Sequence, residues 1–83
     1  MSRTFRILIA DDHAVVRQGL KLLINSQPDM TVVGEAADGA AVLQQTATVE
    51  PDIVVMDLSM PGQNGLVATR ALKEARPSVN IVA

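Results

Sequence analysis

The sequence predicts an α/β domain built on a parallel sheet, and three observations support that class. Strand-like and helix-like segments alternate along the chain of 83 residues. Pro28, Pro51 and Pro77 each close a helix-like segment just before a strand-like one. The apolar runs 7–10 and 53–56 are continuous, which is typical of parallel strands that helices cover on both faces. We therefore expect parallel strands joined by crossover helices.

The first half of the chain predicts a strand, a helix and a second strand. Residues 5–10 are apolar enough for a central strand. Residues 14–26 predict a helix, because apolar side chains recur there at helical spacing on one face. These side chains are Val16, Leu20, Leu23 and Ile24. Residues 30–36, which follow a turn at Pro28, predict a shorter strand.

The second half repeats the alternation. Residues 40–48 predict a short helix that the Asp38 carboxylate caps. Residues 53–57 predict the most apolar strand, residues 64–75 predict the next helix, and residues 79–83 predict the last strand. The inner face of the helix over 64–75 is expected to carry Val67, Ala68, Ala71, Leu72 and Ala75.

Composition excludes several classes of protein. Apolar residues make up 48% of the chain and charged residues 19%, as in an ordinary globular domain. The net charge of −2 provides no attraction for nucleic acid or for an anionic membrane. Without cysteine, and with His13 as the single histidine, disulfides, thiolate sites and multi-histidine metal sites are excluded. No apolar run approaches the roughly 20 residues of a membrane span, and no signal-peptide pattern is present, so we expect a cytoplasmic protein.

Carboxylates follow two of the predicted strands where each strand ends. Asp11 and Asp12 come after the first strand, and Asp57 closes the third. Ligands of open α/β sheets bind beyond the carboxyl ends of the strands, so neighbouring strands would bring these side chains together. Two like charges about 4 Å apart repel by roughly 4 kcal/mol at an effective dielectric of 20, and a cation offsets that repulsion. Oxygen ligands of this kind favour Mg²⁺.

The loop after Asp57 has the composition of an anion-binding segment. It reads Leu-Ser-Met-Pro-Gly-Gln-Asn-Gly over residues 58–65. Pro61 fixes its own φ, and Gly62 and Gly65 permit conformations closed to other residues. Such a loop can aim backbone N–H groups at an anion beside Asp57. A carboxylate nucleophile, a metal and an anion cradle together predict phosphoryl transfer.

Three stretches of the chain carry a resemblance to a known family. They are Ile-Leu-Ile-Ala-Asp-Asp-His (7–13), Val-Val-Gly-Glu-Ala-Ala-Asp-Gly (32–39) and Pro-Asp-Ile-Val-Val-Met-Asp-Leu-Ser-Met-Pro-Gly-Gln-Asn-Gly (51–65). In order and spacing they resemble the receiver domain of a two-component response regulator of the NarL/FixJ group. The pattern Asp-x-x-Met-Pro-x-x-x-Gly at 57–65 is specific. The resemblance implies a flavodoxin-like (CheY-like) α/β fold with strand order 2-1-3-4.

The resemblance also implies a function and a set of site residues. Asp57 would accept a phosphoryl group from a sensor histidine kinase, and the modified chain would switch a transcriptional output rather than turn over a substrate. Mg²⁺ would bind at Asp11, Asp12 and Asp57, with the backbone carbonyl of Ser59 as a further ligand. The implied phosphate loop comprises Met60, Pro61, Gly62 and Gly65.

The chain departs from the family beyond Ala83. The family's switch Ser/Thr, its phosphate-binding Lys, its last strand and its last two helices would follow that residue, as would an output domain. We therefore expect a truncated receiver domain over 1–83 that does not itself bind nucleic acid. Three helices leave part of its sheet uncovered, and the exposed apolar surface predicts self-association or domain swapping.

Other interpretations remain open. An aspartyl phosphatase of the haloacid-dehalogenase kind needs a second acid two residues after its nucleophile, where this chain has Ser59. A flavin-binding protein needs aromatic side chains to stack on the ring, and Phe5 is the single aromatic residue. The strongest rival is an inert or self-associating receiver fragment that cannot complete the switch. Among single residues, His13 is interpreted as an ordinary first-turn helix residue, and Asp12 as a helix cap as readily as a metal ligand.

Overall fold

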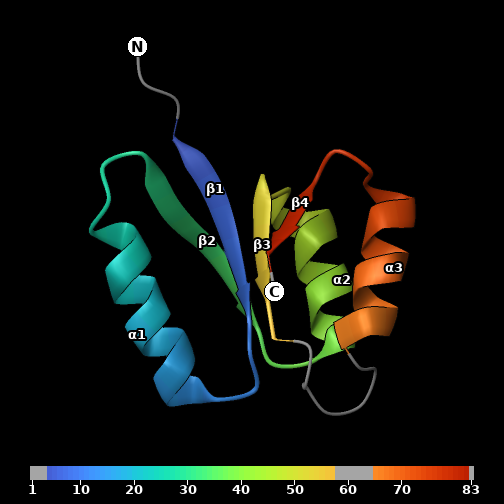
Figure 1. Cartoon of the computed structure of the whole chain (residues 1–83), viewed down its shortest axis with the longest axis horizontal. Coiled ribbons are helices and arrows are strands. Elements are labelled where there is room, and N and C mark those ends of the chain that lie inside the picture. The colour runs from blue at the N-terminus through green and yellow to red at the C-terminus, as the bar shows by residue number, and fades with distance from the viewer. Residues whose placement is uncertain (1–3, 58–64, 83) are drawn as a thin grey trace.

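The computed structural model describes residues 4–57 and 65–82 of the chain. The strands are β1 (Phe5–Ala10), β2 (Met30–Ala36), β3 (Ile53–Met56) and β4 (Asn80–Val82). The helices are α1 (Ala14–Asn25), α2 (Gly39–Val49) and α3 (Gly65–Ala75). The strands pair in parallel as one sheet in the order β2-β1-β3-β4 (Figure 1). The predicted α/β class and strand order are confirmed.

The element boundaries lie within one residue of the predicted ones wherever both ends are described. α2 begins at Gly39, because the Asp38 carboxylate accepts a hydrogen bond from the Ala41 N–H at 2.8 Å, as a helix cap does. β3 ends at Met56, which leaves Asp57 just beyond the strand. Residues 64 and 83, for which the sequence predicts a helix and a strand, lie outside the described residues.

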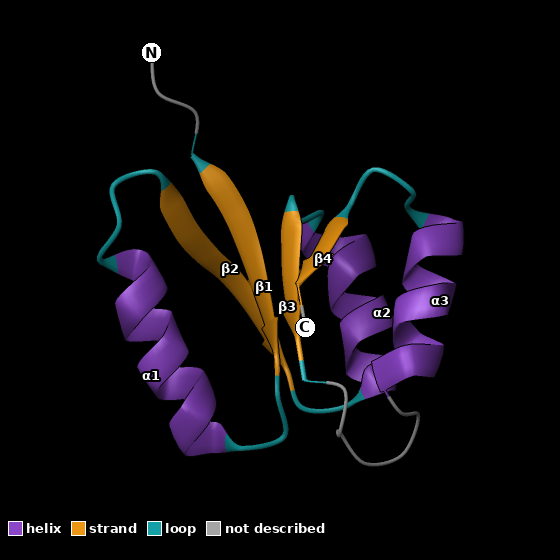
Figure 2. Cartoon of the chain, viewed as in Figure 1, coloured by secondary structure: helices purple, strands orange, loops and turns teal. Residues whose placement is uncertain are grey.

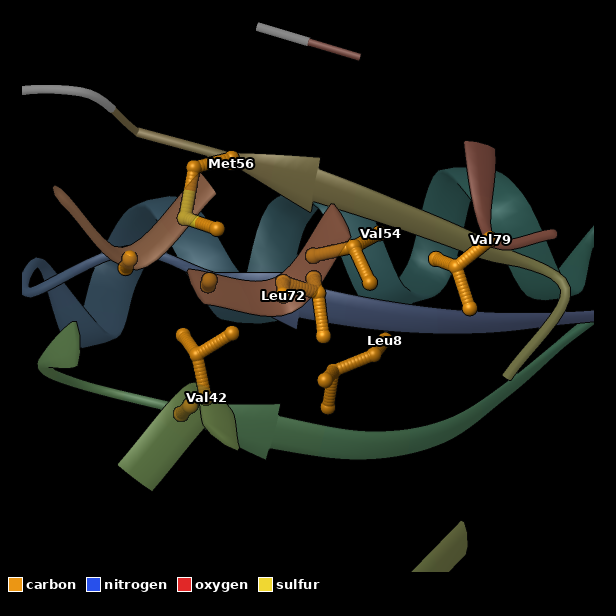
Figure 3. Close-up of a cluster of buried hydrophobic side chains, with 9 residues drawn as sticks. Leu8, Val42, Val54, Met56, Leu72 and Val79 are labelled. Carbon is orange, nitrogen blue, oxygen red and sulfur yellow. The ribbon is translucent and has the colours of Figure 1, made fainter. Parts of the chain in front are cut away.

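Helices lie on both faces of the sheet, with α2 and α3 on one face and α1 on the other (Figure 2). The buried core lies between the sheet and the two helices α2 and α3 (Figure 3). Its members are Leu8, Ala10, Ala36, Val42, Val54, Met56, Ala68, Leu72 and Val79. The prediction for α3 is confirmed at Ala68 and Leu72, which are buried, and wrong at Val67 and Ala75, which are exposed. Ala71 is half-buried. Residues 68 and 72 are four positions apart and therefore share the helix face that packs on the sheet. Val67 lies one position earlier and falls outside that face.

The sheet face beside α1 is less well covered. Because side chains alternate along a strand, the pairing of Ile9 with Val55, and of Val55 with Val82, places these three on the face opposite the core. Ile9 is buried, Val55 is half-buried and Val82 is exposed, so cover is lost from β1 toward β4. α1 has no buried residue, and its Leu22 and Leu23 are exposed. The expected apolar surface is therefore present on this side.

Within the described ranges, no helix combines the length and the hydropathy that crossing a membrane requires.

Candidate metal centre

The acidic residues lie at the carboxyl edge of the sheet, where β1 and β3 end side by side (Figure 1). The β1–β3 register pairs Ala10 with Met56. The ladder continues past this pair, because the Asp57 N–H donates to the Ala10 carbonyl at 2.8 Å. On the other side of β1, the Asp11 N–H donates to the Ala36 carbonyl of β2 at 3.0 Å. These backbone hydrogen bonds place Asp11 and Asp57 at the ends of adjacent strands.

Four side chains meet at this edge. Asp11, Asp12, His13 and Asp57 each offer one ligand atom, and these atoms lie within 4.8 Å of one another. Asp11 and Asp57 are half-buried and Asp12 is exposed, so the cluster is accessible from solvent. The structure thus brings together the three carboxylates that follow the first and third strands in the sequence.

His13 adds a nitrogen atom to the acidic cluster. It is the N-cap residue of α1, with an extended backbone (φ −99°, ψ 109°), and its N–H donates to Asp11 Oδ1 at 2.8 Å. Its ring Nδ1 lies 2.8 Å from Asp11 Oδ1 and 3.0 Å from Asp12 Oδ1. It lies 4.0 Å from Asp57 Oδ2. The hydrogen bond to Asp11, followed by the charge of Asp12, raises the pKa of His13 above its ordinary 6.5.

Two interpretations of single residues change with this geometry. His13 is not an ordinary first-turn residue, since it precedes the helix and its ring contacts the carboxylates. Asp12 does not occupy the cap position of α1, which belongs to His13, and the His13 side chain makes no capping hydrogen bond. The sequence signal that could indicate the contact between His13 and Asp11 is their spacing, because an Asp carboxylate readily accepts the N–H of the residue two positions later.

The donor set suits a hard divalent cation. Three carboxylates supply oxygen ligands, and their mutual repulsion falls when a cation binds among them. The sequence holds neither a thiol nor a second imidazole, which disfavours a zinc or copper centre. The cluster therefore fits Mg²⁺. Of the loop residues expected to contribute, Gly65 is the first residue of α3, and the others lie outside the described residues: Ser59, Met60, Pro61 and Gly62.

Comparison with known proteins places this fold and cluster in a family. The family model for the response regulator receiver domain matches residues 7–83. The chain belongs to this family. The oxygen regulatory protein NreC of Staphylococcus haemolyticus is 49% identical over 78 residues, which cover 93% of this receiver domain and 36% of the relative. The protein of the same name from Staphylococcus aureus (strain JH9) is 47% identical over the same shares. The chain therefore spans about a third of the length of these curated relatives.

Solved receiver domains have the same fold. The response regulator domain of Thermotoga maritima CheB matches with a TM-score of 0.91 and 39% identity, over 95% of this chain and 58% of that one. A LuxR-family two-component response regulator from Aurantimonas sp. SI85-9A1 matches with a TM-score of 0.89 and 42% identity, over 94% and 56%. The isolated REC domain of RcsB from Salmonella enterica serovar Typhimurium, in the presence of phosphomimetic BeF3⁻, matches with a TM-score of 0.88 and 29% identity. The match covers 95% of this chain and 59% of that one. The chain is a CheY-like receiver domain of the NarL/FixJ type.

Proposed function

We propose that this receiver domain accepts a phosphoryl group on Asp57 with Mg²⁺, and thereby switches a transcriptional output carried by a longer protein. The observation that carries the proposal is the meeting of Asp11, Asp12 and Asp57 at the ends of adjacent strands. Membership of the receiver family supports it. The greater length of the curated relatives supports an output region outside the matched segment.

The transfer needs a nucleophile, a donor and a leaving group. A carboxylate oxygen of Asp57 uses a lone pair to form a bond to the phosphorus of a phosphohistidine on a sensor histidine kinase. The P–N bond breaks, and its electron pair leaves with the imidazole, which takes up a proton. The product is an acyl phosphate on Asp57, one per chain, so the domain is modified rather than acting as a turnover enzyme.

The residues around Asp57 fix its backbone and provide the carboxylates that would bind a cation beside it. The Asp57 N–H is bonded to Ala10, while the half-buried carboxylate stays accessible. Asp11 and Asp12 would hold Mg²⁺ together with Asp57, and the ion when bound offsets the negative charge of the carboxylates and of the incoming phosphoryl group. The acquired charge, roughly −1.5 to −2, is the physical signal. The proposed site also includes the Ser59 carbonyl and the loop residues Met60, Pro61, Gly62 and Gly65.

Acetyl phosphate tests the phosphoacceptor directly, with intact-protein mass spectrometry as the readout. We expect one phosphoryl group per chain in the presence of Mg²⁺, and none in EDTA or in Asp57→Asn. Asp38→Asn is the matched control, because it alters an acid at the start of α2 that lies outside the cluster, and it should still be modified. Modification of Asp57→Asn would contradict the assignment. An unmodified wild-type chain would favour the second candidate function.

The second candidate is an inert or self-associating receiver fragment, which the exposed apolar side chains of Val82 on β4 and Leu23 on α1 favour. On this view copies of the chain associate or swap elements through the sheet face beside α1. The remaining parts of the proposal follow from the family and the charge. They are a sensor histidine kinase as phosphodonor, a cytoplasmic location, and DNA contact only through an output domain, since a net charge of −2 does not attract DNA.

A further inference from the structure

We propose that Arg17 is a positioning residue for the acidic cluster, an inference that rests on the proposed function of that cluster. Arg17 belongs to the first turns of α1, and its side chain is only 19% exposed. Its Nη1 donates to the backbone carbonyl of Asp11 at 2.6 Å. Its Nε donates to Glu35 Oε1 at 3.3 Å. The guanidinium therefore joins the loop that carries the acids to β2, across the carboxyl edge of the sheet.

The contact matters because it completes the restraint of Asp11. The Asp11 N–H is bonded to Ala36, its Oδ1 accepts the N–H of His13, and its carbonyl accepts Arg17. These hydrogen bonds hold the peptide groups on both sides of the residue as well as the carboxylate between them. A bond from a charged donor is roughly twice as strong as a neutral one. A ligand held in this way loses less conformational freedom when a cation binds.

The shape of arginine suits this position. Its planar guanidinium directs two N–H groups at two acceptors at once, whereas a lysine ammonium is a point charge on a flexible stem. Lys21 provides a comparison within the same helix. Its Nζ lies 3.5 Å from Glu35 Oε2, and its side chain is 43% exposed. Among the described residues, Lys21 shares Glu35 with Arg17 but makes no contact with Asp11.

The space around Arg17 permits substitution without disturbing the core. A hollow of about 360 Å³ lies beside the guanidinium, lined by Arg17, Gln18, Glu35, Ala36 and Ala37. Water can enter such a polar hollow when the side chain is shortened. The helices α2 and α3, which cover the main hydrophobic core, lie on the opposite side of the sheet from α1 (Figure 2). Variants at position 17 are therefore expected to fold.

Mg²⁺ affinity of the full chain, measured by isothermal titration calorimetry, tests the inference. We expect Arg17→Lys and Arg17→Gln to bind Mg²⁺ about tenfold more weakly than wild type, the usual loss when a residue supporting a metal ligand is changed. Lys21→Gln removes a more exposed ion pair and is expected to leave the affinity nearly unchanged. Asp12→Ala, which removes a proposed ligand, is the positive control for loss of binding.

Two further measurements on the same variants separate positioning from stability. Urea unfolding without Mg²⁺ reports any general loss of stability. Amide NMR shifts of Asp11 and His13 in the folded, Mg²⁺-free protein report the local geometry. A purely structural role would lower the free energy of unfolding and leave the Mg²⁺ affinity of the folded protein unchanged, whereas a positioning role lowers that affinity together with a change in these shifts.

The possible outcomes distinguish this inference from the function on which it rests. Equal Mg²⁺ affinity in wild type and both Arg17 variants would overturn the inference and leave the proposed function standing. A loss in Lys21→Gln as large as that in Arg17→Lys would overturn it too, because charge alone would then explain the effect. Absence of Mg²⁺ binding by wild type would overturn the proposed function, and the inference with it.

Discussion

His13 gives the acidic cluster an imidazole partner within the same loop. Because Asp11 and Asp12 favour the protonated imidazole, the folded chain holds this proton more tightly than the unfolded chain does. A pKa that is higher in the folded state stabilises the fold below the unfolded value near 6.5. That stabilisation is lost as the pH rises through the folded pKa. The ring is exposed, so solvent screens its charge and keeps the stabilisation small.

We expect the His13 ring to titrate above pH 6.5 in the metal-free protein, as measured from its ring proton NMR shifts. Asp11→Asn should lower this pKa more than Asp12→Asn does, because the hydrogen bond to Asp11 is the largest cause of the rise. Asp29→Asn changes an exposed acid in the turn between α1 and β2, and it should leave the pKa unchanged. A wild-type pKa at or below the ordinary value would contradict the contacts around the ring.

At the level of helices and strands, two glycines differ in the space beside them: Gly34 is crowded and Gly19 is open. In β2, the register with β1 shifts by one residue just before Leu8 pairs with Gly34, which is the pattern of a bulge. A Cβ at Gly34 would lie 2.8 Å from Gln45 Oε1 on α2 and 3.1 Å from Leu8 Cδ1. Gly19 lies on α1, and a Cβ there would meet nothing within 4 Å. The two positions therefore report on different kinds of packing.

We expect Gly34→Ala and Gly19→Ala to change the free energy of unfolding in opposite directions. The end of Gln45 can swing away, but Leu8 is fully buried, so Gly34→Ala should destabilise by about 1 kcal/mol. Gly19→Ala raises the helix propensity of α1 and should stabilise by roughly 0.5–1 kcal/mol. Urea unfolding measures both against wild type. Stabilisation by Gly34→Ala would show that α2 does not approach β2 as closely as the structure has it.

Local patterns account for most of what could be predicted about these elements. Apolar runs identify the strands, and a proline precedes each of β2, β3 and β4. Asp38 marks the start of α2, because a cap contacts a residue only three positions away. The bond between Arg17 and Glu35 could not be predicted, since it joins side chains of different elements whose rotamers are defined by packing. The exposure of Val67 also depends on how α3 is rotated against the sheet.

The carboxylate cluster was predictable for a different reason. The carboxyl ends of parallel strands meet at one edge of the sheet, so Asp11 and Asp57 converge once β1 and β3 are neighbours. The place of His13 in the cluster was not predictable on that basis. Its ring reaches the acids because the backbone at His13 is extended and its N–H is held by Asp11, a conformation that spacing alone does not determine.

At the scale of the whole molecule, the described residues leave the sheet with one well-covered and one poorly covered face. α2 and α3 bury the core on the first, while Val82 is 53% exposed on the second. Val82 adjoins Val55 across paired strands, so the exposed surface is contiguous rather than a single side chain. Contiguous apolar surface favours association. Val67 on α3 is about as exposed as Val82, at 48%, but it lies on the other side of the sheet, with α2 and α3.

We expect the average mass of the wild-type chain to rise with concentration in sedimentation velocity experiments. Val82→Lys places a charge in the contiguous surface and should shift the distribution toward the monomer. Val67→Lys introduces the same charge at a similarly exposed valine away from that surface, and it should leave the association unchanged. A monomer whose mass is independent of concentration, with a cooperative thermal melt, would contradict self-association.

Asp57 and its two neighbouring acids form one phosphoacceptor site only if they act together on a phosphoryl group. The phosphomimetic BeF3⁻, which was present with the RcsB receiver domain, requires no phosphodonor, so its binding reports the site directly. Fluorine NMR of the wild-type chain with BeF3⁻ and Mg²⁺ is expected to show protein-bound signals that disappear in EDTA and are absent from Asp57→Asn. A folded wild-type chain without bound signals in Mg²⁺, or bound signals that persist in Asp57→Asn, would contradict the assignment.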